Sequence, residues 1–160
     1  MLKSVSRKFI VNVSRVLFAG YIILLAYFLF FSEDYGRNIS SQDYRYNLVL
    51  FKEMKRFIEY RNIIGMEKFV VNIFGNIFAF APFGFVLPII SKENRKLFHI
   101  TLLSFELSLT VELLQLIFRV GIFDVDDLFM NTLGGFIGGI CFMICHKIYK
   151  TWFEHKIRIK

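Results

Sequence analysis

The chain has 160 residues, of which 56% are apolar and 18% aromatic, and its formal net charge is +7. Soluble domains average about 45–50% apolar residues, and here the excess falls into separate blocks, each near the roughly 20 residues that a helix needs to cross a bilayer. This distribution leaves no stretch for a soluble domain, and it disfavours nucleic acid as a partner, because the basic residues flank the apolar blocks, where they meet lipid.

We predict an all-α fold, a polytopic membrane bundle of four transmembrane helices that forms one membrane domain over residues 1–160. The first span is expected at about residues 14–31, after a basic head. A basic head is also typical of a signal peptide, but Ser32, Glu33 and Asp34 follow the span where a small-residue cleavage site would stand. We therefore expect this span to be retained.

The first connection, residues 32–68, carries seven Lys or Arg and six Asp or Glu. Part of it has apolar residues on one arc of a helix, with charged residues opposite, and this arc comprises Leu50, Phe51, Met54, Phe57, Ile58 and Ile64. The pattern predicts an interfacial helix that lies in the membrane surface. A helix packed on the end of the bundle fits the same pattern equally well.

The remaining spans are expected at about residues 69–90, 97–118 and 127–149, followed by a basic tail. Pro82 lies within the first of these and predicts a kink, because proline removes a backbone hydrogen bond. Lys and Arg concentrate in the head, in the loop 91–96 and after residue 146, whereas the turn 119–126 has only Arg119. This bias predicts a multi-pass protein of the bacterial cytoplasmic membrane with both termini in the cytoplasm.

The third span carries a polar stripe with helical spacing, formed by Thr101, Ser104, Ser108, Glu112, Gln115 and Arg119. An ionisable residue in hydrocarbon costs at least about 2.5–3.5 kcal/mol. We therefore expect the stripe to face the bundle interior or a wet cavity. Glu106 and Thr110 point to the opposite side, and the stripe does not explain them.

Polar residues of three spans are expected at one depth near the outer surface, beside the acidic turn at residues 123–127. Three carboxylates in four residues repel one another unless a cation compensates. One interpretation is a helix start, with Asp126 as the N-cap and Asp127 in the first turn. The other is a site for a cation, an amine or a polar ligand, with the candidate residues Asn72, Asn76, Glu112, Gln115, Arg119, Asp124, Asp126, Asp127 and Asn131.

Small residues predict where the helices pack closely. Gly134 and Gly138 form one small-residue motif on the fourth span, and Gly135 and Gly139 form a second. We expect the fourth span to pack against the small-residue face of the second span. The candidate packing residues are Gly75, Pro82, Gly84, Gly134, Gly135 and Gly138.

No catalytic motif is recognisable, because the sequence has no Gly-x-Ser-x-Gly, no His-Glu-x-x-His and no phosphate-binding loop. The histidines His99, His146 and His155 are expected on the cytoplasmic side, away from the acidic turn. Cys141 and Cys145 lie one helical turn apart in the last span, and we interpret them as small apolar residues. No set of ligands has a diagnostic spacing, so we predict neither a metal site nor a cofactor.

Three motifs in this order resemble the VanZ-like family: residues 72–88 (NIFGNIFAFAPFGFVLP), Ser108-x-x-x-Glu112-x-x-Gln115, and residues 123–135 (FDVDDLFMNTLGG). The resemblance covers about residues 44–142. Members often have Asn-Leu-x-Pro-Phe-Lys before the second span, and this chain has Leu50 in place of the proline. The resemblance implies a small bacterial membrane protein linked to reduced susceptibility to teicoplanin, a lipid-bearing glycopeptide that acts at the outer face.

Three functional hypotheses remain open. In the first, the outer polar residues bind a lipid-linked envelope ligand or a glycopeptide without catalysis, and the other partner is membrane lipid. In the second, the protein is an intramembrane enzyme that acts on a lipid or lipid-linked substrate with Glu112 as the base. In the third, it is a structural or accessory subunit, and the polar cluster only holds the helices together. The ligand and the oligomeric state are left open.

Overall fold

The computed structural model describes residues 2–31, 44–60 and 66–158, and the side chains of residues 8–30, 44–52, 54–56, 58–60 and 73–152. Within these ranges, four helices are long and apolar enough to cross a membrane: α1 (Leu2–Phe31), α4 (Met66–Ile90), α5 (Leu97–Ile117) and α6 (Val125–Arg158). The predicted all-α membrane bundle of four helices is therefore confirmed. Helix α6 continues into the segment that the sequence analysis assigned to a basic tail.

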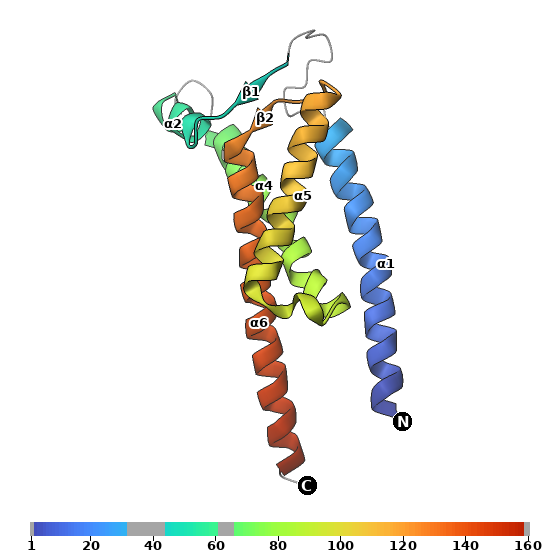
Figure 1. The fold of residues 1–160 in the computed structure, drawn as a ribbon. Helices are drawn as coiled ribbons and strands as arrows, with labels where there is room; N and C mark the ends of the chain where they lie inside the picture. The colour runs from blue at the N-terminus through green and yellow to red at the C-terminus, as the bar shows by residue number, and fades with distance from the viewer. Residues whose placement is uncertain (1, 32–43, 61–65, 159–160) are drawn as a thin grey trace.

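The bundle has two different ends (Figure 1). The terminal end holds the start of α1, the connection between α4 and α5 with the short helix η2 (Glu93–Arg95), and the end of α6. The loop end holds β1 (Tyr46–Asn47), α2 (Lys52–Glu59) and β2 (Phe123–Asp124). The basic segments of the sequence therefore lie at the terminal end, and the acidic turn lies at the loop end.

Helix α6 packs closely on α4 because its glycines leave backbone uncovered. A Cβ on Gly134 would lie 2.3 Å from the carbonyl oxygen of Ile77, and a Cβ on Gly138 would lie 2.0 Å from that of Ala81. Real Cβ atoms essentially never approach other heavy atoms within 3.0 Å. Only glycine therefore fits at these two positions with the helices at their present separation.

A second row of glycines on α6 faces α5. A Cβ on Gly135 would lie 1.9 Å from Oγ of Ser104, and Gly139 follows one turn later in the same row. From the other side, a Cβ on Gly84 of α4 would lie 1.9 Å from the carbonyl oxygen of Gly135. The two rows place α6 against both neighbours, which makes it the central helix of the bundle.

Helix α1 is peripheral, with only 6% of its candidate span buried, and it stands at the edge of the bundle (Figure 1). The hydrogen bonds that attach it include one from the Tyr21 hydroxyl to the Ala79 carbonyl at 2.5 Å and one from the Gln115 side chain to the Leu29 carbonyl at 2.7 Å. Pro82 lies inside α4, and the helix continues unbroken around it although the proline has no N–H to donate to the Phe78 carbonyl.

The first loop forms a helix, as predicted, but α2 covers only Lys52–Glu59. A tight turn precedes it, in which the Lys52 N–H donates to the Val49 carbonyl at 3.2 Å and Phe51 has a φ of 63°. A positive φ at the third residue defines a type II turn, which favours proline at the second residue. Leu50 occupies that second position, so the proline found in relatives suits this turn.

Leu50→Pro is expected to stabilise the fold by about 0.4–1 kcal/mol, because proline would restrict the unfolded chain to an angle that the turn already uses. Little packing would be lost, since Leu50 is 45% exposed. Thermal unfolding of the purified protein in detergent measures this effect. Lys52→Pro is the matched control, and it should destabilise the fold because it removes the N–H that closes the turn. A lower melting temperature for Leu50→Pro would contradict the turn assignment.

Candidate functional site

The candidate site is built where the first loop meets the start of α6. Strands β1 and β2 pair in parallel, with Tyr46 opposite Phe123 and Asn47 opposite Asp124. The Phe123 N–H also donates to the Arg45 carbonyl at 3.1 Å. This short pairing was not predicted, and it fixes the first loop over the acidic turn.

Asp124 is the centre of a buried hydrogen-bond network. Its Oδ1 accepts from Nδ2 of Asn47 at 3.1 Å and from the backbone N–H of Asp126 at 2.8 Å. Its own N–H donates to Oε2 of Glu112 at 2.9 Å. Asn47, Glu112 and Asp124 are all at most 9% exposed. The network therefore ties the first loop, α5 and α6 together at one point.

The N-cap of α6 is Asp124 rather than Asp126. The helix begins at Val125, and the bond from the Asp126 N–H to the Asp124 carboxylate is the interaction that an N-cap makes. The expectation that Asp126 caps the helix was wrong, because the helix starts two residues earlier than predicted. Asp126 lies in the first turn, where its carboxylate accepts from the backbone N–H of Phe51. It thereby attaches the turn before α2 to α6.

Asp127 and Asn76 connect α6 to α4. Nδ2 of Asn76 donates to Oδ1 of Asp127 at 2.6 Å, and Asn76 is 6% exposed. Asp127 also lies in the first turn of α6, where the helix dipole favours a negative charge. The pair places a charged group and an amide on the side of the bundle that faces α1.

An apolar cavity adjoins this pair. It has a volume of about 200 Å³ and lies between α1 and α4, and its lining includes Leu25, Phe28, Ala79 and Asn76. Tyr21 and Asn76 are the polar residues of the lining: the Tyr21 hydroxyl donates to the Ala79 carbonyl, and Asn76 bonds to Asp127. We call this cavity the α1–α4 slot. It brings an apolar surface and a buried polar group into contact at the loop end.

Asn131 lies deeper in the bundle. Its Nδ2 donates to Oγ of Ser108 at 3.0 Å, and the residue is 1% exposed. Its Oδ1 has no hydrogen-bond partner among the atoms that the structure describes. Buried acceptors of this kind are uncommon and costly. Asn131 therefore offers one acceptor to a donor such as a water molecule or a ligand hydroxyl.

Gln115 and Arg119 differ from the other candidate site residues in what their side chains contact. Gln115 is buried, and its side chain bonds to α1 through the Leu29 carbonyl. Arg119 is exposed, has a φ of 57°, and holds its guanidinium 4.6 Å from the centre of the Tyr44 ring. The contact seen for the Arg119 side chain is thus with an aromatic ring of the first loop, whereas the sequence analysis grouped Arg119 with the carboxylates.

Asn47 was not predicted as a site residue, and the side chain of Asn72 lies outside the described residues. Asn47 also accepts from the Val49 N–H at 3.3 Å, an Asn side chain bonding the backbone two residues on. That local signal, an Asn at the start of a turn, was available in the sequence. Its bond to Asp124, 77 residues away, was not.

No group of three His, Cys, Asp or Glu side chains is arranged to hold a metal ion in the part of the chain that the structure describes. Cys141 and Cys145 are both exposed on α6. The chemistry that the site offers is therefore hydrogen bonding by amides and carboxylates beside an apolar slot.

Comparison with known proteins gives two matches. The sequence model of the VanZ/LLP1 family matches residues 18–146. A relative from Enterococcus faecium, described as Protein VanZ, is 34% identical over 127 residues, which are 78% of this chain and 70% of the relative. No solved structure shows a significant match to the chain.

Proposed function

Because the chain belongs to the VanZ/LLP1 family, we propose that it lowers the susceptibility of bacterial cells to teicoplanin-type lipoglycopeptides by binding a lipid-bearing ligand at the loop end. The ligand is a lipid-linked envelope molecule or the lipoglycopeptide itself. In this proposal the loop end faces the outside of the cytoplasmic membrane, and both termini lie in the cytoplasm.

The position of Asn76 is the observation that carries the proposal. It lines the apolar α1–α4 slot, and its amide is bonded to Asp127 at the loop end. A ligand with an acyl or isoprenoid chain and a polar group needs this combination, an apolar slot next to a few oriented polar groups. Helix α1 is held by few contacts, so it is the element that would yield when a chain enters.

The contacts at the loop end support the other two hypotheses, an intramembrane enzyme and a structural subunit, less well. A general base needs a carboxylate that can reach a substrate proton, but Glu112 is 2% exposed and accepts a hydrogen bond from the Asp124 N–H. A purely structural role fits Glu112 and Asp124, which connect elements of the fold. A purely structural role does not explain why the apolar α1–α4 slot has the buried amide of Asn76 in its lining.

Ala79→Leu tests the proposal, because Ala79 lines the α1–α4 slot and a leucine side chain would occupy it. A ligand chain in the slot would then be overpacked against this leucine, at a cost of about 1–3 kcal/mol to the complex, so we expect the affinity for the ligand to fall about 5- to 150-fold. The measurement is the minimal inhibitory concentration of teicoplanin in a susceptible host that expresses the protein. Protection should be largely lost, with the amount of protein in the membrane unchanged.

Ala26→Leu is the matched control, since Ala26 is exposed on α1 and does not line the slot. It should leave protection at the level of the unmodified protein. A glycopeptide without an acyl chain serves as the ligand control, and protection against it should be small in every variant. Full protection by Ala79→Leu at normal abundance would contradict the proposed slot.

A further inference from the structure

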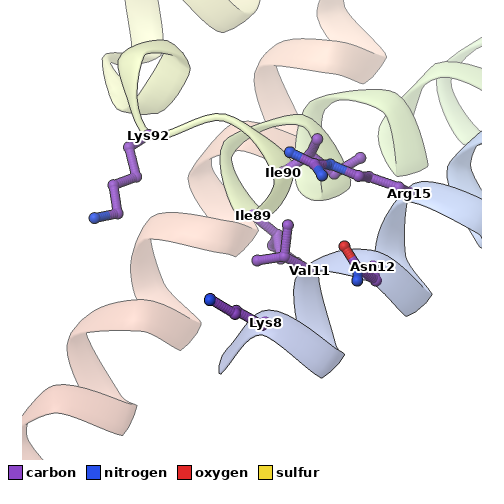
Figure 2. Close-up of a pocket in the computed structure, with 7 residues that line it drawn as sticks. All are labelled: Lys8, Val11, Asn12, Arg15, Ile89, Ile90 and Lys92. Carbon is purple, nitrogen blue, oxygen red and sulfur yellow. The ribbon is translucent and has the colours of Figure 1, made fainter. Parts of the chain in front are cut away.

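A second cavity lies between α1 and α4, nearer the terminal end than the α1–α4 slot, and Figure 2 shows the residues that line it. Its volume is about 380 Å³, and it lies between residues 8–15 of α1 and the end of α4. The polar residues that line it are the cations Lys8, Arg15 and Lys92 and the amide Asn12. No carboxylate is among its lining residues, so every charged group that lines the cavity is a cation.

Two of the cations share one face of α1 because of their spacing. Lys8, Asn12 and Arg15 are four and three residues apart, which places them on one face of α1. Figure 2 shows these side chains on the side of α1 that faces the end of α4, with Ile89 close to Val11 between them. The cavity thus has an apolar middle with charged groups around it.

The depth of the cavity matches a lipid headgroup. The cavity lies beside the end of α4 at Ile90, next to the basic loop 91–96, where the sequence predicts that the chain leaves the membrane. Arg15 lies at the start of the first span that the sequence predicts, about residues 14–31, which places its guanidinium near the level of lipid headgroups.

We propose that this cavity binds the phosphate headgroup of an anionic phospholipid. Lys8, Arg15 and Lys92 would surround the phosphate, and the apolar residues Val11 and Ile89 would contact the first part of an acyl chain. Basic pockets between helices bind such headgroups by charge complementarity. A zwitterionic lipid carries its own cation beside the phosphate, which the three cations of the cavity would repel. This site is independent of the function proposed for the loop end.

The test uses the full chain purified in a neutral detergent and titrated with phosphatidylglycerol, with bound lipid counted by native mass spectrometry. Phosphatidylcholine with the same acyl chains is the ligand control and should bind far less. Arg15→Gln and Lys92→Gln should each lower the affinity for phosphatidylglycerol about fivefold. Lys52→Gln removes the same charge from the exposed surface at the loop end and should change nothing.

Val11→Trp distinguishes a cavity from general surface attraction. It would fill the apolar part of the cavity and keep every charge, so phosphatidylglycerol should bind at least about fivefold more weakly. Leu17→Trp is its control, because Leu17 is 67% exposed on the same helix. Melting temperatures equal to that of the unmodified protein show that each variant is folded.

Four results would overturn the assignment. The first is equal binding of phosphatidylglycerol and phosphatidylcholine. The second is unchanged binding to Val11→Trp. The third is a loss in Lys52→Gln equal to that in Arg15→Gln. The fourth is complete displacement of the lipid by inorganic phosphate, which would make the cavity a site for a free anion. Retention of the lipid in excess inorganic phosphate supports the proposal.

Discussion

Gly138→Ala is expected to destabilise the bundle by about 3 kcal/mol, near the upper end of the usual cost of adding a methyl group to a packed core. The new Cβ would lie 2.0 Å from the carbonyl oxygen of Ala81 and 3.0 Å from the backbone nitrogen of Phe85. Both atoms belong to the backbone of α4, so no change of side-chain rotamer can remove the clash. The two helices would have to separate along the whole row.

Two other glycines provide graded controls. Gly139→Ala would meet only the ends of the Leu97 and Ile100 side chains, at 2.9 and 3.2 Å, and these can move. Gly20→Ala would meet nothing within 4 Å on the exposed face of α1. The melting temperatures in detergent should therefore fall strongly for Gly138→Ala, moderately for Gly139→Ala and not at all for Gly20→Ala. An equal fall for Gly138→Ala and Gly20→Ala would contradict the close packing of α4 and α6.

The polar stripe of the third span shows what could be predicted from the sequence. Ser104, Ser108, Glu112 and Gln115 are all buried in the structure. Lipid cannot solvate polar groups, so helical spacing alone indicates which face of a membrane helix turns inward. On the opposite face, the Thr110 hydroxyl donates to the Glu106 carbonyl at 2.7 Å, so its own helix satisfies it. The carboxylate of Glu106 is exposed, and nothing in the structure explains it.

The partners within the candidate site could not be predicted in the same way. The pairing of β1 with β2 involves two residues on each side, which is too short to leave a periodic pattern. The roles of Asp124 and Asp126 depend on where α6 begins, and helix boundaries are uncertain by a few residues from sequence alone. The peripheral place of α1 depends on its contacts with α4, and its apolar sequence is equally suited to a central helix.

Asp124→Ala is the second substitution with a large expected effect. It removes the acceptor for two donors, Nδ2 of Asn47 and the backbone N–H of Asp126. A buried donor that loses its partner costs about 1–3 kcal/mol, so we expect a loss of roughly 2–6 kcal/mol from the two together. The measurements are the melting temperature in detergent and the amount of protein in the membrane. Both should fall well below those of the unmodified protein.

Asp124→Asn separates the charge from the hydrogen bonds. Its Oδ1 can still accept from both donors, so its melting temperature should be much closer to that of the unmodified protein than the melting temperature of Asp124→Ala is. A loss as large as that of Asp124→Ala would show that the negative charge itself is needed. A double-mutant cycle with Asn47→Ala measures the bond between the two side chains, and a coupling of about 0.5–3 kcal/mol is expected for groups in contact. Strict additivity would contradict the bond.

Asp127→Asn provides the contrast that relates this network to function. Its side-chain oxygen can still accept from Asn76, so the connection between α6 and α4 should survive, while the negative charge beside the α1–α4 slot is lost. If this charge contacts the ligand, Asp127→Asn should lower teicoplanin protection at normal abundance. Asp124→Ala, by contrast, should lower protection only in proportion to its abundance, because its carboxylate holds the first loop on α6. Proportional loss in both variants would assign both carboxylates to the fold alone.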